Sequence, residues 1–251
     1  NYNMLSLANT IGSSSAATAI ESFAVSTTSL ALDGAGDYAT FTETTFAIKG
    51  AGNDLSIVFW AKRTDNNDIA WVLGQGDTAS FKRLNFSADG TALEIESDQN
   101  GQLASGEVTA DTNWHHYAVT IAGTDSTIMA EVLMYEDGED ISATNNNFGV
   151  TAGKGFTINQ IGAPVGSGSN THEFKGLLYQ GAIYDTVLEA EEVAQIYNDG
   201  LTIPLQGNLG VYFKSLNLKH LWRFATTADT VGSLDLTYVG DAAASSTIPT
   251  S

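Results

Sequence analysis

The chain has 251 residues, and 10 Lys and Arg stand against 29 Asp and Glu, which gives a formal net charge of −19. Such a charge repels nucleic acids and anionic membranes, so we expect neither as a partner. Cysteine is absent, which excludes disulfides, thiolate metal sites and a cysteine nucleophile. No apolar run approaches the ~20 residues of a membrane-spanning helix, so membrane insertion is not expected.

Short strands dominate the pattern that follows an N-terminal arm. Residues 1–28 are rich in Ser, Thr and Ala and are predicted to form that arm. The run at 55–61 is apolar nearly throughout, which indicates a strand buried on both faces. Strands separated by Gly, Asn and Asp at this spacing are typical of a β-sandwich or jelly roll. The predicted strands lie at 30–32, 38–42, 55–61, 70–73, 84–86, 93–95, 114–121, 132–135 and 156–161.

A strand at 177–184 is followed by the one clear helix pattern of the chain, near 188–198. Glutamates crowd its first turn, where the helix dipole favours negative charge. Asp185 or Thr186 is expected to cap the helix, and Gly200 is expected to take the left-handed stop. The apolar face of the helix follows the spacing i, i+3, i+4 and consists of Val193, Ile196 and Tyr197.

Beyond the helix the composition changes. Residues 201–210 have the composition of a linker, and the patterns at 216–224 and 234–239 predict further strands. The residues at 242–251 are expected to form a loose tail. The pattern leaves open whether the segment 201–251 closes the same sandwich or forms a small appendage.

Five sequence blocks match one known fold in the order in which they occur. They are SLALDG with Asp37-Tyr38 (29–38), LSIVFWAK (55–62), WHHYAV (114–119), YEDG (135–138) and the strand and helix at 176–200. Together they resemble the LamG-like jelly rolls of the concanavalin A-like lectin/glucanase superfamily. The resemblance implies an all-β fold, a two-sheet antiparallel β-sandwich with one short helix near 188–198. The implied parts are an N-terminal arm at 1–28, a jelly roll at 29–200 and C-terminal closing strands with a tail at 201–251.

The catalytic motifs are incomplete. Glucanases of this superfamily carry Glu-x-Asp-x-x-Glu on a strand, which places carboxylates on one sheet face for retaining hydrolysis. Glu96 and Asp98 match the first two positions, but Gly101 occupies the third. His115 and His116 are adjacent in a strand and therefore point to opposite faces, and the chain has no histidine spacing typical of zinc sites. We therefore expect that the protein is not an enzyme.

Calcium is the one cofactor that the sequence leaves open, because Ca²⁺ takes six to eight oxygen ligands. The candidate ligands lie in predicted turns and are Asp33, Asp37, Asp137 and Asp140. Ordinary Asx turns and a solvated acidic surface are the competing interpretation of these residues. The resemblance also implies an Asp-Glu pair in the closing strand, but this chain has Tyr179-Gln180 there.

A sugar site would need an aromatic platform beside polar groups on an exposed face. The carbohydrate-binding candidates are Trp71, Tyr179, Tyr184 and Trp222. Core packing is the competing interpretation for each of them, because large aromatic side chains also dominate protein interiors. Trp60 and Trp114 lie in the strongest strand patterns and are predicted to belong to the core.

The first functional hypothesis is a non-enzymatic structural or attachment protein of a tailed-phage virion, a capsid decoration or a fibre subunit. The stretch 198–224 resembles the closing arrangement of LamG-like proteins in such virions, and residues 1–15 lack the basic start and apolar core of a signal peptide. The hypothesis implies a location on the virion surface. Its partners would be other virion proteins of the capsid or tail, further copies in a homo-oligomer, and a cell-surface glycan.

Two alternatives belong to other classes of protein. One is a secreted, extracellular bacterial carbohydrate-binding or adhesion module assisted by calcium. The other, less favoured, is a glycoside hydrolase whose turnover would depend on Glu96 and Asp98.

Overall fold

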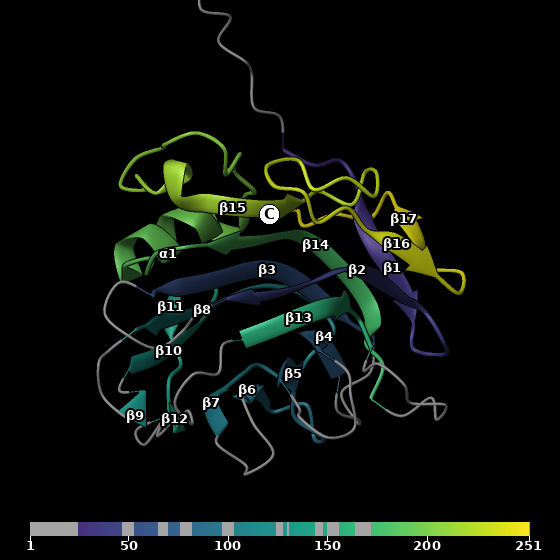
Figure 1. Ribbon diagram of the computed structural model, residues 1–251, viewed down its shortest axis with the longest axis horizontal. Coiled ribbons are helices and arrows are strands. Elements are labelled where there is room, and N and C mark those ends of the chain that lie inside the picture. The colour runs from purple at the N-terminus through teal and green to yellow at the C-terminus, as the bar shows by residue number, and fades with distance from the viewer. Residues whose placement is uncertain are drawn as a thin grey trace, which may run out of the picture.

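The protein consists of two β-sheets packed face to face (Figure 1). The computed structural model describes residues 25–46, 53–64, 70–75, 82–96, 103–123, 128–129, 131–143, 148–149, 156–163 and 172–250. Within these residues all strand pairings are antiparallel and there is one α-helix, α1 (Ala190–Tyr197). No helix in this part of the chain is long and apolar enough to cross a membrane. The predicted all-β sandwich with one short helix is confirmed.

Sheet A contains the most buried strands. Its order is β11 (Glu139–Asp140), β10 (Glu131–Glu136), β8 (Trp114–Ala122), β3 (Leu55–Arg63), β14 (Lys175–Tyr184), β1 (Ser29–Asp33) and β17 (Ala243–Ser245). A further strand, β15 (Leu218–Trp222), pairs with β14 beyond the part that pairs with β1. The apolar run at 55–61 forms β3 and is buried at every position, as its sequence predicts.

Sheet B is the second layer. Its order is β16 (Thr237–Val239), β2 (Tyr38–Phe46), β13 (Phe156–Ile161), β4 (Ala70–Gln75), β5 (Lys82–Phe86), β6 (Ala92–Glu96) and β7 (Leu103–Glu107). A separate two-stranded ribbon joins β9 (Ile128–Met129) to β12 (Phe148–Gly149). The sequence pattern missed β7, because Leu103-Ala-Ser-Gly-Glu107 has few β-branched or aromatic residues.

The C-terminal segment contributes strands to both sheets. β16 pairs with β2 in sheet B, and β17 pairs with β1 in sheet A with Ser245 opposite Ser29. The predicted loose tail is therefore wrong over Ala243–Ser245, whose small residues gave no strand signal. The hydroxyl of Ser29 also donates to the carbonyl of Thr247 at 2.7 Å. Of the predicted N-terminal arm, residues 1–24 lie outside the described residues.

Two apolar clusters explain the layering. One lies between the sheets, and the other lies on the outer face of sheet A, where α1 and the segment 203–221 cover it. Figure 1 shows α1 and β15 on the side of β14 that faces away from sheet B. Val193 and Ile196 of α1 are buried there, and each contributes about 1.5–3 kcal/mol. That burial stabilises a helix too short to persist alone.

The ends of α1 differ from the sequence prediction. The N-cap is Glu189, and neither Asp185 nor Thr186 has that role. The backbone N–H of Glu189 donates to Glu192 Oε2 at 3.2 Å. The side chain of Glu192, in the first turn, thus satisfies the backbone N–H of the N-cap residue, as in a capping box. The left-handed stop begins at Asn198, where φ is 48°, two residues before Gly200.

Candidate functional site

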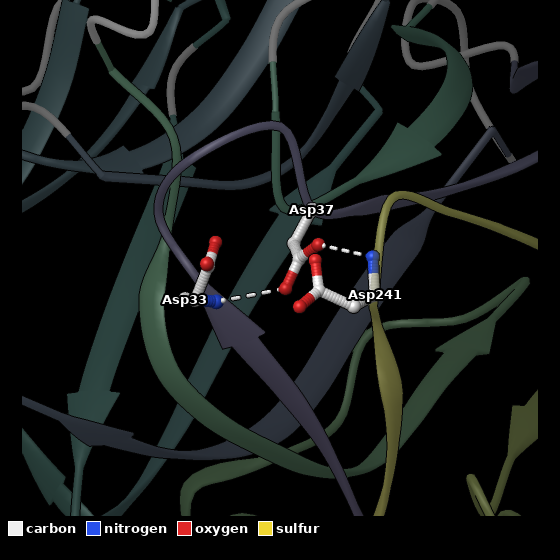
Figure 2. Close-up of side chains that lie close together, drawn as sticks. All are labelled: Asp33, Asp37 and Asp241. Carbon is white, nitrogen blue, oxygen red and sulfur yellow. Dashed lines mark hydrogen bonds between the residues drawn. The ribbon is translucent and has the colours of Figure 1, made fainter.

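Three carboxylates meet where the first and last strands of the sandwich lie side by side (Figure 2). Asp33 ends β1, Asp37 lies in the turn before β2, and Asp241 lies in the turn between β16 and β17. One oxygen from each of the three lies within 4.8 Å of the other two. Hydrogen bonds fix the central residue, because Asp37 Oδ2 accepts from the Asp33 N–H at 3.1 Å and Asp37 Oδ1 from the Asp241 N–H at 2.7 Å.

The turn between β16 and β17 can approach Asp37 only because it contains a glycine. Gly240 has φ 72°, a left-handed conformation that L side chains rarely adopt. A Cβ at this position would overlap the Asp37 carboxylate and the carbonyl of Gly36. The Gly240-Asp241 dipeptide thus brings the third carboxylate to the other two.

The cluster offers oxygen ligands of the kind that Ca²⁺ prefers. It borders an open hollow that is also lined by Thr64 and by residues of β1 and β14, among them Lys175. Asp37 is 2 % exposed, whereas Asp33 and Asp241 are exposed to solvent. Three carboxylates this close repel one another, and a divalent cation would relieve that repulsion.

The structure brings together two of the four predicted calcium ligands, Asp33 and Asp37. Asp137 and Asp140 lie elsewhere and bind protein donors, because Asp140 Oδ1 accepts from the Ser142 N–H at 2.9 Å. Asp241 was missed, since more than two hundred residues separate it from Asp33. The one local signal for it was the Gly-Asp turn after the alternating pattern at 234–239.

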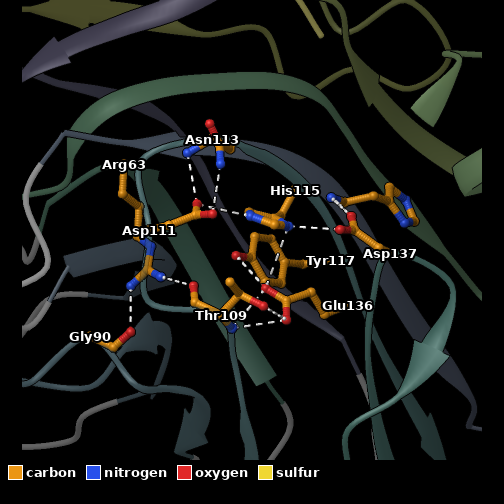
Figure 3. Close-up of polar contacts among 10 residues, drawn as sticks. Arg63, Gly90, Thr109, Asp111, Asn113, His115, Tyr117, Glu136 and Asp137 are labelled. Atoms are coloured by element: carbon orange, nitrogen blue, oxygen red, sulfur yellow. Dashed lines mark hydrogen bonds and ion pairs between the residues drawn. The ribbon is translucent and has the colours of Figure 1, made fainter. Parts of the chain in front are cut away.

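A second polar cluster surrounds His115 at one end of sheet A (Figure 3). The His115 ring lies between two carboxylates, with Nδ1 2.7 Å from Asp137 Oδ2 and Nε2 3.0 Å from Asp111 Oδ1. Glu136 Oε1 lies 3.8 Å from Nδ1. The hydrogen bond with Asp137 is the main reason why the pKa of His115 is raised from 6.5 to about 9.

Protein donors already occupy the carboxylates of this cluster. Glu136 accepts from the Thr109 N–H at 2.9 Å and from the Tyr117 hydroxyl at 3.1 Å. Arg63 donates to the carbonyls of Gly90 at 2.7 Å and Thr109 at 2.8 Å, so the cluster ties three loops to one end of the sandwich. We assign it to the architecture of the fold and not to ligand binding.

Three of the four predicted aromatic sugar ligands are wrong, because they are buried. Tyr179 and Tyr184 are 0 % exposed and Trp222 is 2 % exposed. Each polar tip binds the protein: the Tyr179 hydroxyl donates to the Ser26 carbonyl, and Trp222 Nε1 donates to the Leu234 carbonyl. Tyr184 is buried under α1 and the segment 203–221, whereas Trp222 is part of the core between the two sheets. The side chain of Trp71 lies outside the described residues, but its backbone is in β4.

Three polar residues and one tryptophan position line up across four strands of sheet B. On β5 and β6 the core residues alternate with polar ones, which places Asn85 and Glu94 on the face away from sheet A. In the strand register Trp71 is opposite Asn85, Asn85 is opposite Glu94, and Glu94 is opposite Ser105. We call these four residues the sheet B row. The described helix and the covering segment 203–221 both lie on sheet A, not on this face.

One polar atom of the sheet B row has no hydrogen-bond partner among the described residues. Asn85 Nδ2 donates to Glu94 Oε2 at 3.0 Å and to the Phe86 carbonyl at 2.9 Å. Asn85 Oδ1 is buried and accepts no hydrogen bond from the part of the chain that the structure describes. A buried amide oxygen in this state costs about 1–3 kcal/mol, which is unusual enough in a native fold to mark the place.

A family model described as the concanavalin A-like lectin/glucanases superfamily matches residues 33–194, more than half of the chain. The chain belongs to this superfamily. The match runs from Asp33 at the end of β1 into α1, and it confirms the resemblance that the five sequence blocks carry. No curated protein matches the sequence.

Two solved structures have the superfamily's sandwich in a similar arrangement. One, from Bacteroides ovatus, is provisionally assigned as a carbohydrate binding protein; it has TM-score 0.60 and 13% identity over 91% of this chain and 62% of its own. This chain therefore spans less than two thirds of that longer protein. The other is the heptameric SAP-like pentraxin of Limulus polyphemus, with TM-score 0.52 and 16% identity over 88% of this chain and 95% of its own. At these identities the likeness shows the shared fold.

Proposed function

We propose that the protein is a carbohydrate-binding module whose glycan lies on the outer face of sheet B. The observation that carries the proposal is the sheet B row, in which an aromatic position, an amide, a carboxylate and a hydroxyl are aligned across four strands. Stacking of an aromatic ring on a sugar, beside a few placed polar groups, is the usual composition of a glycan site. The assignment of the Bacteroides ovatus structure supports the same class of ligand.

The polar side chains of the sheet B row have different roles in the proposed binding of sugar hydroxyls. Glu94 accepts one hydrogen bond from Asn85, and its remaining lone pairs can accept from hydroxyls of the ligand. Asn85 itself is 0 % exposed, so its role is to orient the Glu94 carboxylate through this bond and not to contact the ligand. Trp71 is the one predicted aromatic ligand on this sheet.

A glycan array and titration calorimetry with the best glycan test the proposal. Replacement of Trp71 by Ala should weaken binding at least tenfold, about 1.4 kcal/mol, because stacking and buried area are both lost. Glu94→Ala should have a similar effect. Phe213→Ala is the matched control, since Phe213 is an exposed aromatic residue outside sheet B. Absence of any glycan signal, or equal losses in Trp71→Ala and the control, would refute the site.

We propose further that Ca²⁺ bound by Asp33, Asp37 and Asp241 assists the module by joining β1 to the C-terminal hairpin. Three carboxylates from two distant parts of the chain would be held by one ion, so the ion should stabilise the sandwich and not contact the glycan. At a free Ca²⁺ concentration of about 100 times Kd, the gain in unfolding free energy is about 2.7 kcal/mol.

Thermal unfolding with calcium and with a chelator measures this gain. The midpoint should rise with calcium in the natural sequence and in Asp140→Asn, and it should not respond in Asp37→Asn. Asp140 is a fair control because it lies in β11, at the other edge of sheet A, and accepts one backbone bond. An equal response of all three proteins would place the ion elsewhere.

The role as a virion attachment protein stays a prediction, as do its partners and the location on a virion surface. We propose no catalytic activity. Glu96 belongs to β6, whereas Asp98 lies outside the described residues, and Gly101 still occupies the third position of the glucanase motif. A hydrolase would release reducing sugar from the bound glycan, and we expect none.

A further inference from the structure

An apolar ridge is exposed beside α1, on the side of the molecule opposite sheet B. It consists of Leu209, Val211, Phe213 and Leu216, which are 45 %, 48 %, 64 % and 91 % exposed. Single exposed apolar residues are ordinary, but four within eight positions form a patch of the kind that binds another surface. Most of the other large apolar side chains in the described residues are buried.

The segment that carries the ridge is held rigidly. Leu209 and Tyr212 exchange two backbone hydrogen bonds of 2.9 and 3.1 Å, and the Tyr212 hydroxyl donates to the Leu205 carbonyl at 2.7 Å. The Phe213 N–H donates to Glu192 of α1 at 3.1 Å. The ridge is therefore preorganised, and binding to it costs little conformational entropy.

The charge of the protein argues against a second copy as the occupant. At a formal charge of −19, two copies repel each other at moderate ionic strength. Residues 1–20 carry no acidic and no basic side chain, so this stretch can approach the ridge without that repulsion. It is also apolar near its start, with Tyr2, Met4, Leu5, Leu7 and Ile11.

The N-terminal stretch joins the body close to the covering segment of sheet A. The Ser26 carbonyl accepts a hydrogen bond from Tyr179 at 2.9 Å, and the next residue of that strand, Gln180, donates to the Ile203 carbonyl at 2.7 Å. A stretch of 24 residues spans up to ~80 Å when extended, whereas a domain of this size has a radius of gyration of roughly 18 Å. The apolar residues at 2–11 can thus reach the ridge, with the Gly-Ser-Ala-Thr residues at 12–18 as the connection.

We infer that residues 2–11 bind the apolar ridge of their own chain. The covalent connection gives the stretch a millimolar effective concentration at the ridge, so it outcompetes a neighbouring copy at micromolar protein by about a hundredfold or more. The inference does not depend on the proposed glycan site, which lies on the other sheet.

Disulfide trapping tests the inference, and because the sequence contains no cysteine, only the introduced thiols can react. In the full chain, Leu5→Cys is combined with Leu216→Cys, and in the control with Thr42→Cys, an exposed residue on the outer face of sheet B. Under mild oxidation at micromolar protein, the first pair should form an intramolecular disulfide and the control pair should not. Equal yields in both pairs, or a disulfide-linked dimer as the main product, would overturn the inference.

A second measurement avoids any bias from oxidation. The thiol of Leu216→Cys alone is labelled with a maleimide, with and without the additional changes Leu5→Ser and Leu7→Ser. These changes should raise the labelling rate about tenfold, because they weaken the cover over residue 216, and they should not alter the rate of Thr42→Cys. An unchanged rate at residue 216 would show that another surface, or none, covers the ridge.

Discussion

The free energy of unfolding should be greatest near pH 6.5 and should decrease toward both pH 4 and pH 9 because two adjacent histidines of β8 titrate in opposite senses. His116 has its pKa lowered from 6.5 to about 4, and His115 has its pKa raised from 6.5 to about 9. The two side chains lie on opposite faces of one strand, as alternation requires. Each face imposes its own environment.

His116 accounts for the acid side. Its ring is 1 % exposed and packs between Trp60, at 5.2 Å between ring centroids, and Tyr197 at 6.3 Å. Burial lowers its pKa, and neither ring nitrogen has a hydrogen-bond partner in the described part of the chain. Between pH 6.5 and 4 the unfolded chain therefore binds a proton that the folded chain does not. As the pH decreases from 6.5 to 4, the free energy of unfolding therefore decreases by up to about 3 kcal/mol.

His115 accounts for the alkaline side. Its charged form is held by Asp137 and Asp111, so the folded chain keeps a proton between pH 6.5 and 9 that the unfolded chain releases. The stabilisation is complete below pH 6.5 and is lost as pH rises through 9. Its upper limit is again about 3 kcal/mol.

Denaturant unfolding from pH 4 to pH 9 separates the two effects. His116→Phe keeps a ring between Trp60 and Tyr197 and removes the unpaired nitrogens, so it should be more stable than the natural sequence, increasingly so as pH falls. His115→Gln should lose the decline between pH 6.5 and 9 and leave the acid side unchanged. The assignment is wrong if either variant keeps the pH profile of the natural sequence.

Replacement of Asp229 by Ala should destabilise the protein by about 3–5 kcal/mol, the largest single effect that we expect. The Asp229 side chain is fully buried in the C-terminal segment, and its two oxygens accept from five donors. These donors are His220 Nδ1 at 2.6 Å and the backbone N–H groups of Leu221, Val231, Gly232 and Leu234 at 2.9–3.2 Å. Burial alone would raise the pKa of Asp229, but the hydrogen bonds, that of His220 first, hold it well below its usual range.

The matched control is Asp235→Ala. Asp235 is an exposed residue of the same segment whose carboxylate accepts one backbone bond, from Asp229 at 2.9 Å. Its loss should cost about 1 kcal/mol. Calorimetry should therefore show a fall in Tm of roughly 10 °C for Asp229→Ala and a few degrees for the control. Similar shifts in the two variants would mean that the buried carboxylate does not organise the segment.

Local patterns predicted most of the sandwich, because the spacing of apolar residues reflects which positions of a strand or helix are buried. The apolar run at 55–61 indicated a strand covered on both sides, and β3 is covered by sheet B and by α1. The sequence pattern did not predict a strand where pairing with a distant strand, and not residue type, stabilises it. Ala243–Ser245 forms a strand because it pairs with β1, and three small residues give no strand signal in the sequence.

The candidate sites depend even more on distant partners. Asp33 and Asp37 were predicted from one turn, whereas Asp241 joins them only through the pairing of the chain's ends. Tyr179, Tyr184 and Trp222 were candidates for a sugar platform, but all three are buried, Trp222 in the core between the sheets. The sheet B row was not foreseen, since its alignment depends on the register between four strands.

The pairing of the last strands with the first has a consequence for biosynthesis. Ser29 pairs with Ser245 and Tyr38 pairs with Val239, so about 200 residues or more must be synthesised after β1 and β2 before either contact can form. Contacts this distant in sequence slow folding, because the closing of a long loop precedes the gain from pairing. Until then β1 and β2 are open sheet edges, the usual starting points of aggregation. Truncation after Val239 would leave the edge of β1 open, and expression should be more sensitive to this truncation than to substitutions within Ala243–Ser245.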